Sequence, residues 1–256
     1  MIDAHIHLDL YHKESLDEQI EEWKMGGCQA VIAVSNDLAS SYRSLELQAR
    51  YPDFVFAAVG FHPEYPLPSE AEFLEWQSLV TVEKARITAI GEIGLPHYEL
   101  DKLPHSLDKY IDFLSRCLQV AQLNQLPVAL HAVHDKAKIV LDLLQQLGIK
   151  QAHFHWLKAP KDVVLEIVGA GYFISVTPEI CYRERDQRLA ELVPLRQLLV
   201  ETDGPWSYKA PFEGQRTSPL MIERAIQKVA EVKGISIDLV RNQLVMNTRG
   251  CYHLII

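Results

Sequence analysis

The sequence predicts an α/β fold, a single (β/α)₈ TIM barrel spanning residues 1–256. Eight apolar, β-rich runs alternate strictly with segments of helical spacing, which is typical of a parallel sheet with right-handed crossovers. Eight such units within about 250 residues favour a closed barrel over an open sheet, with the active site at the C-terminal ends of the strands. No linker, repeat or low-complexity tract divides the chain, so one domain is expected.

The expected strands and helices follow in order along the chain. The strands are expected at residues 2–8, 28–35, 54–61, 87–95, 126–133, 151–157, 172–177 and 198–206. The helices between them are expected at residues 16–25, 38–50, 69–83, 107–124, 136–147, 161–168 and 186–192, and two more at 218–232 and 237–246. Gly27, Gly148 and Gly171 come just before strands, where glycine commonly ends a helix.

The composition excludes several classes of protein. A hydrophobic content of 48% is ample for a large core, and a net charge of −9 lacks the basic excess typical of nucleic-acid-binding proteins. The chain has four cysteines, Cys28, Cys117, Cys181 and Cys251. They form no C-x-x-C pair, which excludes zinc fingers and a disulfide framework. No long apolar segment or signal peptide is evident, so a cytoplasmic protein without membrane association is expected, and no protein partner is predicted.

The first nine residues are the first candidate for a functional site. In a strand, alternate side chains share a face, so one face would carry Asp3, His5 and His7, and the other would carry Ile2, Ala4, Ile6 and Leu8. The two imidazoles would lie about 6.6–7 Å apart along the strand, within reach of one metal ion or an adjacent pair. A lone His-x-His is more often structural, so the interpretation depends on ligands from other strands.

Other predicted strands carry ionisable residues near their C-terminal ends, where a barrel places its catalytic groups. These residues are His62, Glu92, His131, His153, His155 and Asp203. Burying unpaired ionisable groups is costly, so a shared metal centre explains their placement. Histidine and carboxylate ligands suit one or two ions of zinc, manganese or nickel, with magnesium also possible. Glu92 has two oxygens with which to bridge two ions.

Four motifs together resemble the TatD family of metal-dependent deoxyribonucleases, which are amidohydrolase-like TIM barrels. They are Asp3-Ala-His-Ile-His-Leu-Asp9, Gly60-Phe-His-Pro63, Gly91-Glu-Ile-Gly-Leu95 and Glu201-Thr-Asp203. The resemblance runs over the whole chain and implies the metal ligands His5, His7, Glu92, His131, His155 and Asp203. It also implies that His62 lines the substrate site and that the substrate is DNA, trimmed from a 3′ end.

The chain departs from the family pattern at four positions. Pro96 stands where Asp is common, Val133 where Arg is common, Gly204 where Ser or Ala is usual, and Gly250 at the position of an Arg. The metal positions are retained, whereas several polar groups that could hold a phosphate are missing. The metal chemistry is therefore better supported than the substrate.

Two histidines compete for one ligand position on the sixth strand. His155 lies nearer the strand end and fits the family's His-then-aromatic pattern, so His153 is expected to be a packed neighbour of the metal ligands. Two interpretations stay open for the aromatic residues beyond the strand ends, which would either stack on a base or simply close the barrel: Tyr98, Trp156 and Trp206.

The leading functional hypothesis is phosphodiester hydrolysis by metal-activated water, with Asp203 as the general base and Glu92 as a second catalytic carboxylate. A second hypothesis is hydrolysis of a small cyclic amide, ester or phosphoester by the same centre. A third is a metal-containing binding protein with little catalysis.

Overall fold

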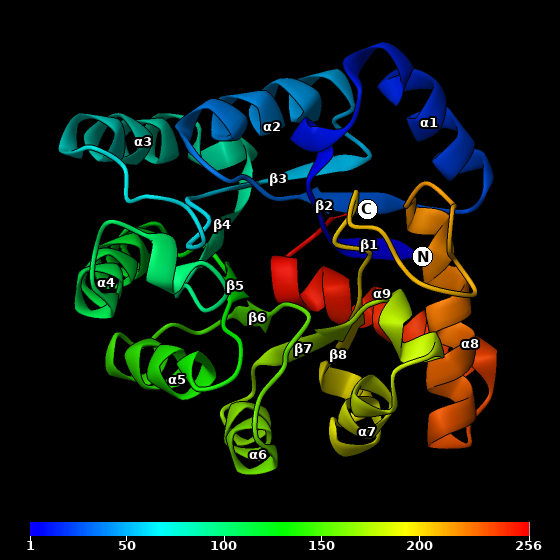
Figure 1. The fold of residues 1–256 in the computed structure, drawn as a ribbon. Helices are drawn as coiled ribbons and strands as arrows, with labels where there is room; N and C mark the ends of the chain where they lie inside the picture. Colours follow the sequence, from blue (N-terminus) through cyan, green and yellow to red (C-terminus); the bar gives the residue numbers. More distant parts are fainter. Residues whose placement is uncertain (256) are drawn as a thin grey trace.

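Eight parallel strands form one sheet whose order follows the sequence, β1 to β8, in the computed structural model, which describes residues 1–255 (Figure 1). The strands are β1 (Ile2–Ile6), β2 (Ala30–Ala33), β3 (Val55–Val59), β4 (Ile87–Gly94), β5 (Val128–His131), β6 (Ala152–Phe154), β7 (Phe173–Val176) and β8 (Leu198–Val200). Each strand pairs in parallel with the next, and the crossovers place the helices around the outside of the sheet (Figure 1).

The barrel closes through backbone contacts just beyond β8. Ile6 forms an isolated parallel bridge with Gly204. The backbone N–H of His7 donates to the Gly204 carbonyl at 2.8 Å, and the N–H of Asp203 donates to the His5 carbonyl at 2.9 Å. The same contacts that join the first and last strands therefore carry three of the expected site residues. The predicted TIM barrel is confirmed.

The helices alternate with the strands as expected. They are α1 (Lys13–Met25), α2 (Leu38–Arg50), α3 (Glu70–Val82), α4 (Leu107–Asn124), α5 (Lys136–Gln146), α6 (Lys161–Gly169), α7 (Glu184–Leu192), α8 (Ile222–Lys233) and α9 (Ile237–Tyr252). Short 3₁₀ helices lie at Leu8–Leu10, Lys84–Arg86, Leu100–Lys102, Pro178–Cys181, Leu195–Gln197 and Pro219–Met221. Within residues 1–255, none of the helices has the length and apolar character needed to cross a bilayer.

All eight strands end earlier than the sequence pattern predicts, six of them by one or two residues and β6 and β8 by three and six. β6 stops at Phe154 and β8 at Val200, so His155 and Asp203 lie just past their strands. Trp156 has φ 37° and Asp203 φ 47°, a left-handed backbone that leaves the strand direction. After β6 the apolar pattern continues through the turn, because Trp156 and Leu157 are buried, and this extended the predicted strand.

The alternation predicted for β1 is wrong in part. Ile2 and Ala4 pack inside the barrel with Tyr252, whereas Ile6 and Leu8 pack outside against α1. The register of β1 against β2 shifts between Asp3 and Ile6, and this irregularity moves the later apolar side chains to the other face.

Helix α9 is longer than predicted and packs against β1 and β8. The buried cluster that includes Tyr252 draws small side chains from β2, β3, β4 and β5, so the aromatic ring fills the barrel interior. Asn247 is buried in the added turns, and its Nδ2 donates to the carbonyls of Leu195 (2.6 Å) and Leu198 (2.8 Å). A polar residue on the buried face interrupted the apolar pattern and hid the last part of the helix.

Gly204 fits because the Tyr11 hydroxyl fills the space next to it. A Cβ atom at position 204 would lie 2.1 Å from that hydroxyl oxygen, which is itself buried and donates to the Thr217 carbonyl at 3.0 Å. The small residue at this departure from the family pattern thus has a local steric reason.

We predict that Gly204→Ala lowers the free energy of unfolding by about 1–3 kcal/mol, because an added methyl group overpacks this contact. Tyr11→Phe alone should cost about 1 kcal/mol through its lost hydrogen bond. The double variant should lose less unfolding free energy than the sum of the two single losses, as measured by urea unfolding with a chelator present. Additive losses would contradict the proposed steric contact.

Candidate metal centre

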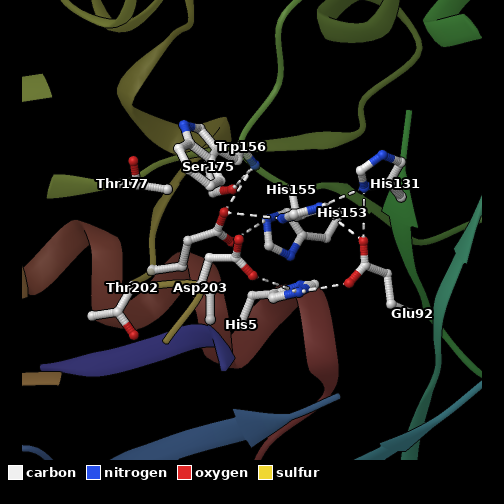
Figure 2. Close-up of polar contacts among 12 residues, drawn as sticks. His5, Glu92, His131, His153, His155, Trp156, Ser175, Thr177, Thr202 and Asp203 are labelled. Atoms are coloured by element: carbon white, nitrogen blue, oxygen red, sulfur yellow. Dashed lines mark hydrogen bonds and ion pairs between the residues drawn. The ribbon is translucent and has the colours of Figure 1, made fainter. Parts of the chain in front are cut away.

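The predicted ligand residues come together at the C-terminal mouth of the barrel. His5 lies on β1, Glu92 on β4 and His131 at the end of β5, while His7, His155 and Asp203 lie one to three residues past their strands. Figure 2 shows His5, Glu92, His131, His155 and Asp203 converging on one volume. Segments almost 200 residues apart in the chain therefore meet here because parallel barrel strands all end at the same face.

Glu92 is the centre of this cluster. One of its carboxylate oxygens, Oε2, lies 3.0 Å from His5 Nε2 and 3.3 Å from His7 Nε2. The other, Oε1, lies 2.9 Å from His155 Nε2 and 3.0 Å from His131 Nδ1. The Glu92 side chain is fully buried. Each oxygen faces its own pair of imidazoles, the arrangement expected of a carboxylate that bridges two cations.

The charge balance of the cluster favours bound cations. Burial alone would raise the pKa of Glu92, but the charge of His155 and a hydrogen bond from His131 hold it well below its usual range. Burial likewise lowers the pKa of His7, yet Asp203 and Glu92 raise it to about 10. The two carboxylates thus stabilise positive charge at this position.

Asp203 is the carboxylate that faces the open pocket. Its Oδ1 lies 3.5 Å from His5 Nε2 and 3.4 Å from His7 Nε2, and its side chain is 13% exposed. Burial raises the pKa of Asp203, but the hydrogen bond from His7 and the nearby His155 lower it by more. The net pKa is below its usual value, so Asp203 is ionised at neutral pH. It can therefore accept a proton from a group in the pocket.

The donor set fits a divalent metal. Three groups of ligand atoms lie within 4.8 Å of one another: His5, His7 and Glu92; His62, Glu92 and His131; and His5, His155 and Glu201. Glu92 belongs to two of these groups. Several of their buried atoms have no hydrogen-bond partner among the described residues: both ring nitrogens of His5, His7 Nδ1, His155 Nδ1, Glu92 Oε2 and Glu201 Oε2. Buried polar atoms without partners are costly, and coordination to a metal would satisfy the two that face each other across the cluster, His5 Nε2 and Glu92 Oε2.

His62, which was expected only to line the substrate site, lies next to Glu92 in the cluster. Its Nε2 is 3.5 Å from Glu92 Oε1, and its Nδ1 accepts the backbone N–H of Glu64 at 3.2 Å. Burial, together with the neighbouring histidines, lowers the pKa of His62 to about 3 although Glu92 opposes this shift. His62 is therefore neutral, and because Nδ1 accepts a backbone N–H, its proton is on Nε2, which lies near Glu92.

Sequence reasoning missed Glu64, which directly follows the Gly-Phe-His-Pro motif. Its carboxylate accepts the backbone N–H groups of His97, Tyr98 and Glu99 at 2.8, 3.0 and 2.8 Å and lies 3.1 Å from His131 Nε2. Burial opposes ionisation, but the hydrogen bonds from His131 and the three backbone groups lower the pKa of Glu64 to about 2. Glu64 thus fixes the His131 ring and the loop beside it.

Glu201, the first residue of the Glu-Thr-Asp motif, lies next to the cluster. It is fully buried, and its Oε1 accepts the backbone N–H of Trp156 at 2.8 Å and lies 3.4 Å from His155 Nδ1. Its Oε2 lies 3.3 Å from His153 Nε2. The other ring nitrogen of His153 faces the Tyr252 hydroxyl at 2.7 Å, beneath the cluster. The structure thus places His153 against Tyr252 and Glu201 in the barrel interior.

A cavity of about 610 Å³ opens above the cluster. His7, His62, His131, His155 and Asp203 form its floor, and Val133 lies in its wall. Three aromatic side chains on its rim are about half exposed: Tyr65, Tyr98 and Trp206, at 53%, 49% and 56%. Trp156 is 7% exposed and packs against Tyr208, so it closes the barrel. Tyr98 and Trp206 remain accessible to a ligand.

Comparison with known proteins gives the family. The model of the family described as TatD related DNase matches residues 2–253. A Haemophilus influenzae protein described as an uncharacterized metal-dependent hydrolase is 36% identical, over 99% of this chain and all of its own length. Human deoxyribonuclease TATDN3 is 30% identical, over 93% of this chain and 89% of its own length.

Solved structures give the same fold. The Escherichia coli TatD homologue YJJV superimposes with a TM-score of 0.88 at 24% identity, covering all of this chain and 98% of that one. A TatD family hydrolase from Entamoeba histolytica gives 0.85 at 19% identity, over 98% and 97% of the two chains. On the family match and the similarity to these relatives, the chain belongs to the TatD-related DNase family of metal-dependent hydrolases.

Proposed function

We propose that this protein hydrolyses phosphodiester bonds in DNA and removes nucleotides from a 3′ end. One observation carries the proposal: a buried glutamate, Glu92, faces two pairs of histidines at the mouth of the barrel, with Asp203 open to the pocket. The name of the human relative supports DNA as the substrate. The proposed location is the cytoplasm, where the four free cysteines would stay reduced.

The proposed cofactor is one or two divalent ions of zinc, manganese, magnesium or nickel. The proposed ligands are His5, His7, Glu92, His131, His155 and Asp203. When bound, such an ion supplies a Lewis acid that lowers the pKa of water from 15.7 toward about 7.

Three residues of the chain would have separate roles in the reaction. Asp203 is ionised and open to the pocket, so it accepts the proton that the attacking water loses. Neutral His62 lines the pocket and carries an Nε2–H that can donate to a phosphate oxygen. Glu92 is sealed from solvent and acts by holding the ligand histidines in place.

A second candidate is hydrolysis of a small cyclic amide, ester or phosphoester. The pocket favours it in one respect, because Lys158 is the only lysine or arginine among the described residues that line it. The net charge of −9 also repels a polyanion at long range. Turnover of such a compound, without cleavage of DNA under any metal condition, would favour this candidate.

We predict that hydrolysis is lost on chelation and returns with a divalent metal. Metal that binds only the folded state should also raise the free energy of unfolding, by about 2.7 kcal/mol at a metal concentration of 100 times its Kd. The melting temperature should rise accordingly. Elemental analysis, thermal melting and cleavage of labelled single-stranded DNA check this expectation, with His12→Ala as a surface control. Full turnover by metal-free protein would refute it.

We predict different outcomes for the two histidines of the β6 segment. His155→Ala should remove metal and activity together. His153→Ala should keep metal but lose about 1–3 kcal/mol of stability, because Glu201 Oε2 loses the group that faces it and the Tyr252 hydroxyl keeps only its 3.4 Å contact with the Ala4 carbonyl. Metal content per chain and urea unfolding with a chelator distinguish the variants. The reverse pattern would exchange the two proposed roles.

We predict that Glu64→Gln weakens metal affinity or activity by about 10–100-fold, the usual effect of losing a group that orients a metal-binding histidine. Glutamine keeps one acceptor oxygen for the backbone N–H groups of the neighbouring loop but removes the negative charge next to His131 Nε2. Isothermal titration with metal measures the affinity, and Glu75→Gln on exposed α3 is the control. Unchanged affinity and turnover would mean that Glu64 serves only the loop.

A further inference from the structure

A second cavity adjoins the pocket of the metal centre. It has a volume of about 1170 Å³ and lies between the β5–α5 loop, the β6–α6 loop and α7, which Figure 1 shows on one side of the barrel. Lys158 and His134 belong to its wall, and Lys158 also lines the metal pocket. Lys158 therefore lies on the border between the two cavities.

The ammonium group of Lys158 is held in place by two aromatic side chains. Its Nζ donates to the Tyr98 hydroxyl at 3.0 Å and lies 4.2 Å from the centre of the Trp156 ring. Its backbone carbonyl accepts the N–H of His134. Lys158 forms no ion pair with any of residues 1–255, although the rings of Tyr98 and Trp156 orient it. A fixed, uncompensated cation in a half-buried position is suited to bind an anion.

A second uncompensated cation follows along the same segment. Lys161 is the first residue of α6, lines the outer cavity and likewise has no ion pair in the described part of the chain. The arginines of this cavity differ, because Arg185 pairs with Asp186 at 2.8 Å and Arg188 with Glu184 at 2.6 Å. The available positive charge thus lies on the side of Lys158 and Lys161.

The acidic groups that line the outer cavity do not neutralise Lys158 and Lys161. Asp135 pairs with Lys136 at 2.6 Å. Glu191, on α7, also lines the cavity and would repel an anion near it. A polyanion entering this cavity would therefore follow the β6–α6 loop and avoid α7.

The rim of the metal pocket offers surfaces for bases. Tyr98 and Trp206 are about half exposed, and Tyr98 also holds Lys158. Stacking on an aromatic ring requires a base that is free of its partner strand and tolerates any sequence. Phosphate-binding cations next to exposed rings are the combination found in sites for single-stranded nucleic acid.

We propose that Lys158 binds a phosphate next to the one that is cleaved and that Lys161 binds a phosphate farther along the same strand. The substrate would then be a single-stranded DNA end of several nucleotides whose uncleaved part runs into the outer cavity. This inference rests on the proposed phosphodiesterase function and adds the path of the strand. It assigns a role to a loop lysine that the metal chemistry does not use.

The test compares a long and a short substrate with the metal-loaded protein. Binding is measured by fluorescence anisotropy with labelled dT8 whose phosphorothioate linkages resist cleavage. Hydrolysis is measured with unmodified dT8 and with thymidine 5′-p-nitrophenyl phosphate, which has a single phosphate. The variants are Lys158→Gln, Lys161→Gln and Lys158→Arg. The control is Lys84→Gln, which removes an exposed lysine before β4, at the opposite end of the barrel.

Lys158→Gln and Lys161→Gln should each weaken dT8 binding on the order of tenfold, since each loses one charge-assisted contact. Each should also reduce the slope of log K against log salt by about 0.7. The value of kcat/KM should fall on the order of tenfold more for dT8 than for the thymidine ester. Lys158→Arg should recover most of the dT8 binding, and Lys84→Gln should bind dT8 as the wild type does.

Wild-type affinity and salt slope in Lys158→Gln would overturn the inference, even if the wild type cleaves DNA and the proposed function holds. Equal losses on dT8 and the thymidine ester would also overturn it, because Lys158 would then act at the cleaved phosphate. Binding of dT8 that depends on Lys158, without any DNA cleavage, would support the phosphate site and reject the proposed function. Neither binding nor cleavage by the wild type would reject both.

Discussion

The structure depends on the burial of one carboxylate, Glu92, between histidines from three other strands. An isolated buried carboxylate would cost several kcal/mol, and this one is stable only if its partners stay within about 3 Å. His5 and His131 meet that requirement because they lie on β1 and β5, whose positions the parallel pairing fixes. The barrel therefore acts as a rigid frame, and its closure beyond β8 is part of the site.

The cluster also depends on a layer of polar contacts beneath it. Glu201 binds the backbone at Trp156 and faces both His155 and His153, and His153 in turn contacts Tyr252 from α9. These groups lie in the barrel interior, where each needs a partner in the absence of water. The C-terminal helix thus stabilises the site from below. It must extend to Tyr252, its last residue, to make this contact.

The sequence was sufficient for the barrel and for the residues at the strand ends because both follow from repeated local patterns. The pattern could not show where strands stop, since buried turn residues such as Trp156 are as apolar as strand residues. It also failed for β1, where a shift in register moves Ile6 to the outer face. Glu64 has no local signal beyond its place after a His-Pro pair, because its partners lie more than 30 residues away.

In the proposed function, residues on or just past the strand ends would perform the chemistry and residues farther along the loops would select the substrate. Glu92 and His131 lie on strands, where a displacement would disturb the parallel pairing of the sheet. Lys158 and Trp206 lie three residues past ligand positions, in loops that can change without moving those ligands. Val133 shows the same separation, because an apolar residue occupies the pocket wall two positions after His131 while the cluster stays complete. A barrel of this kind can therefore keep one metal centre and take substrates of different length and charge.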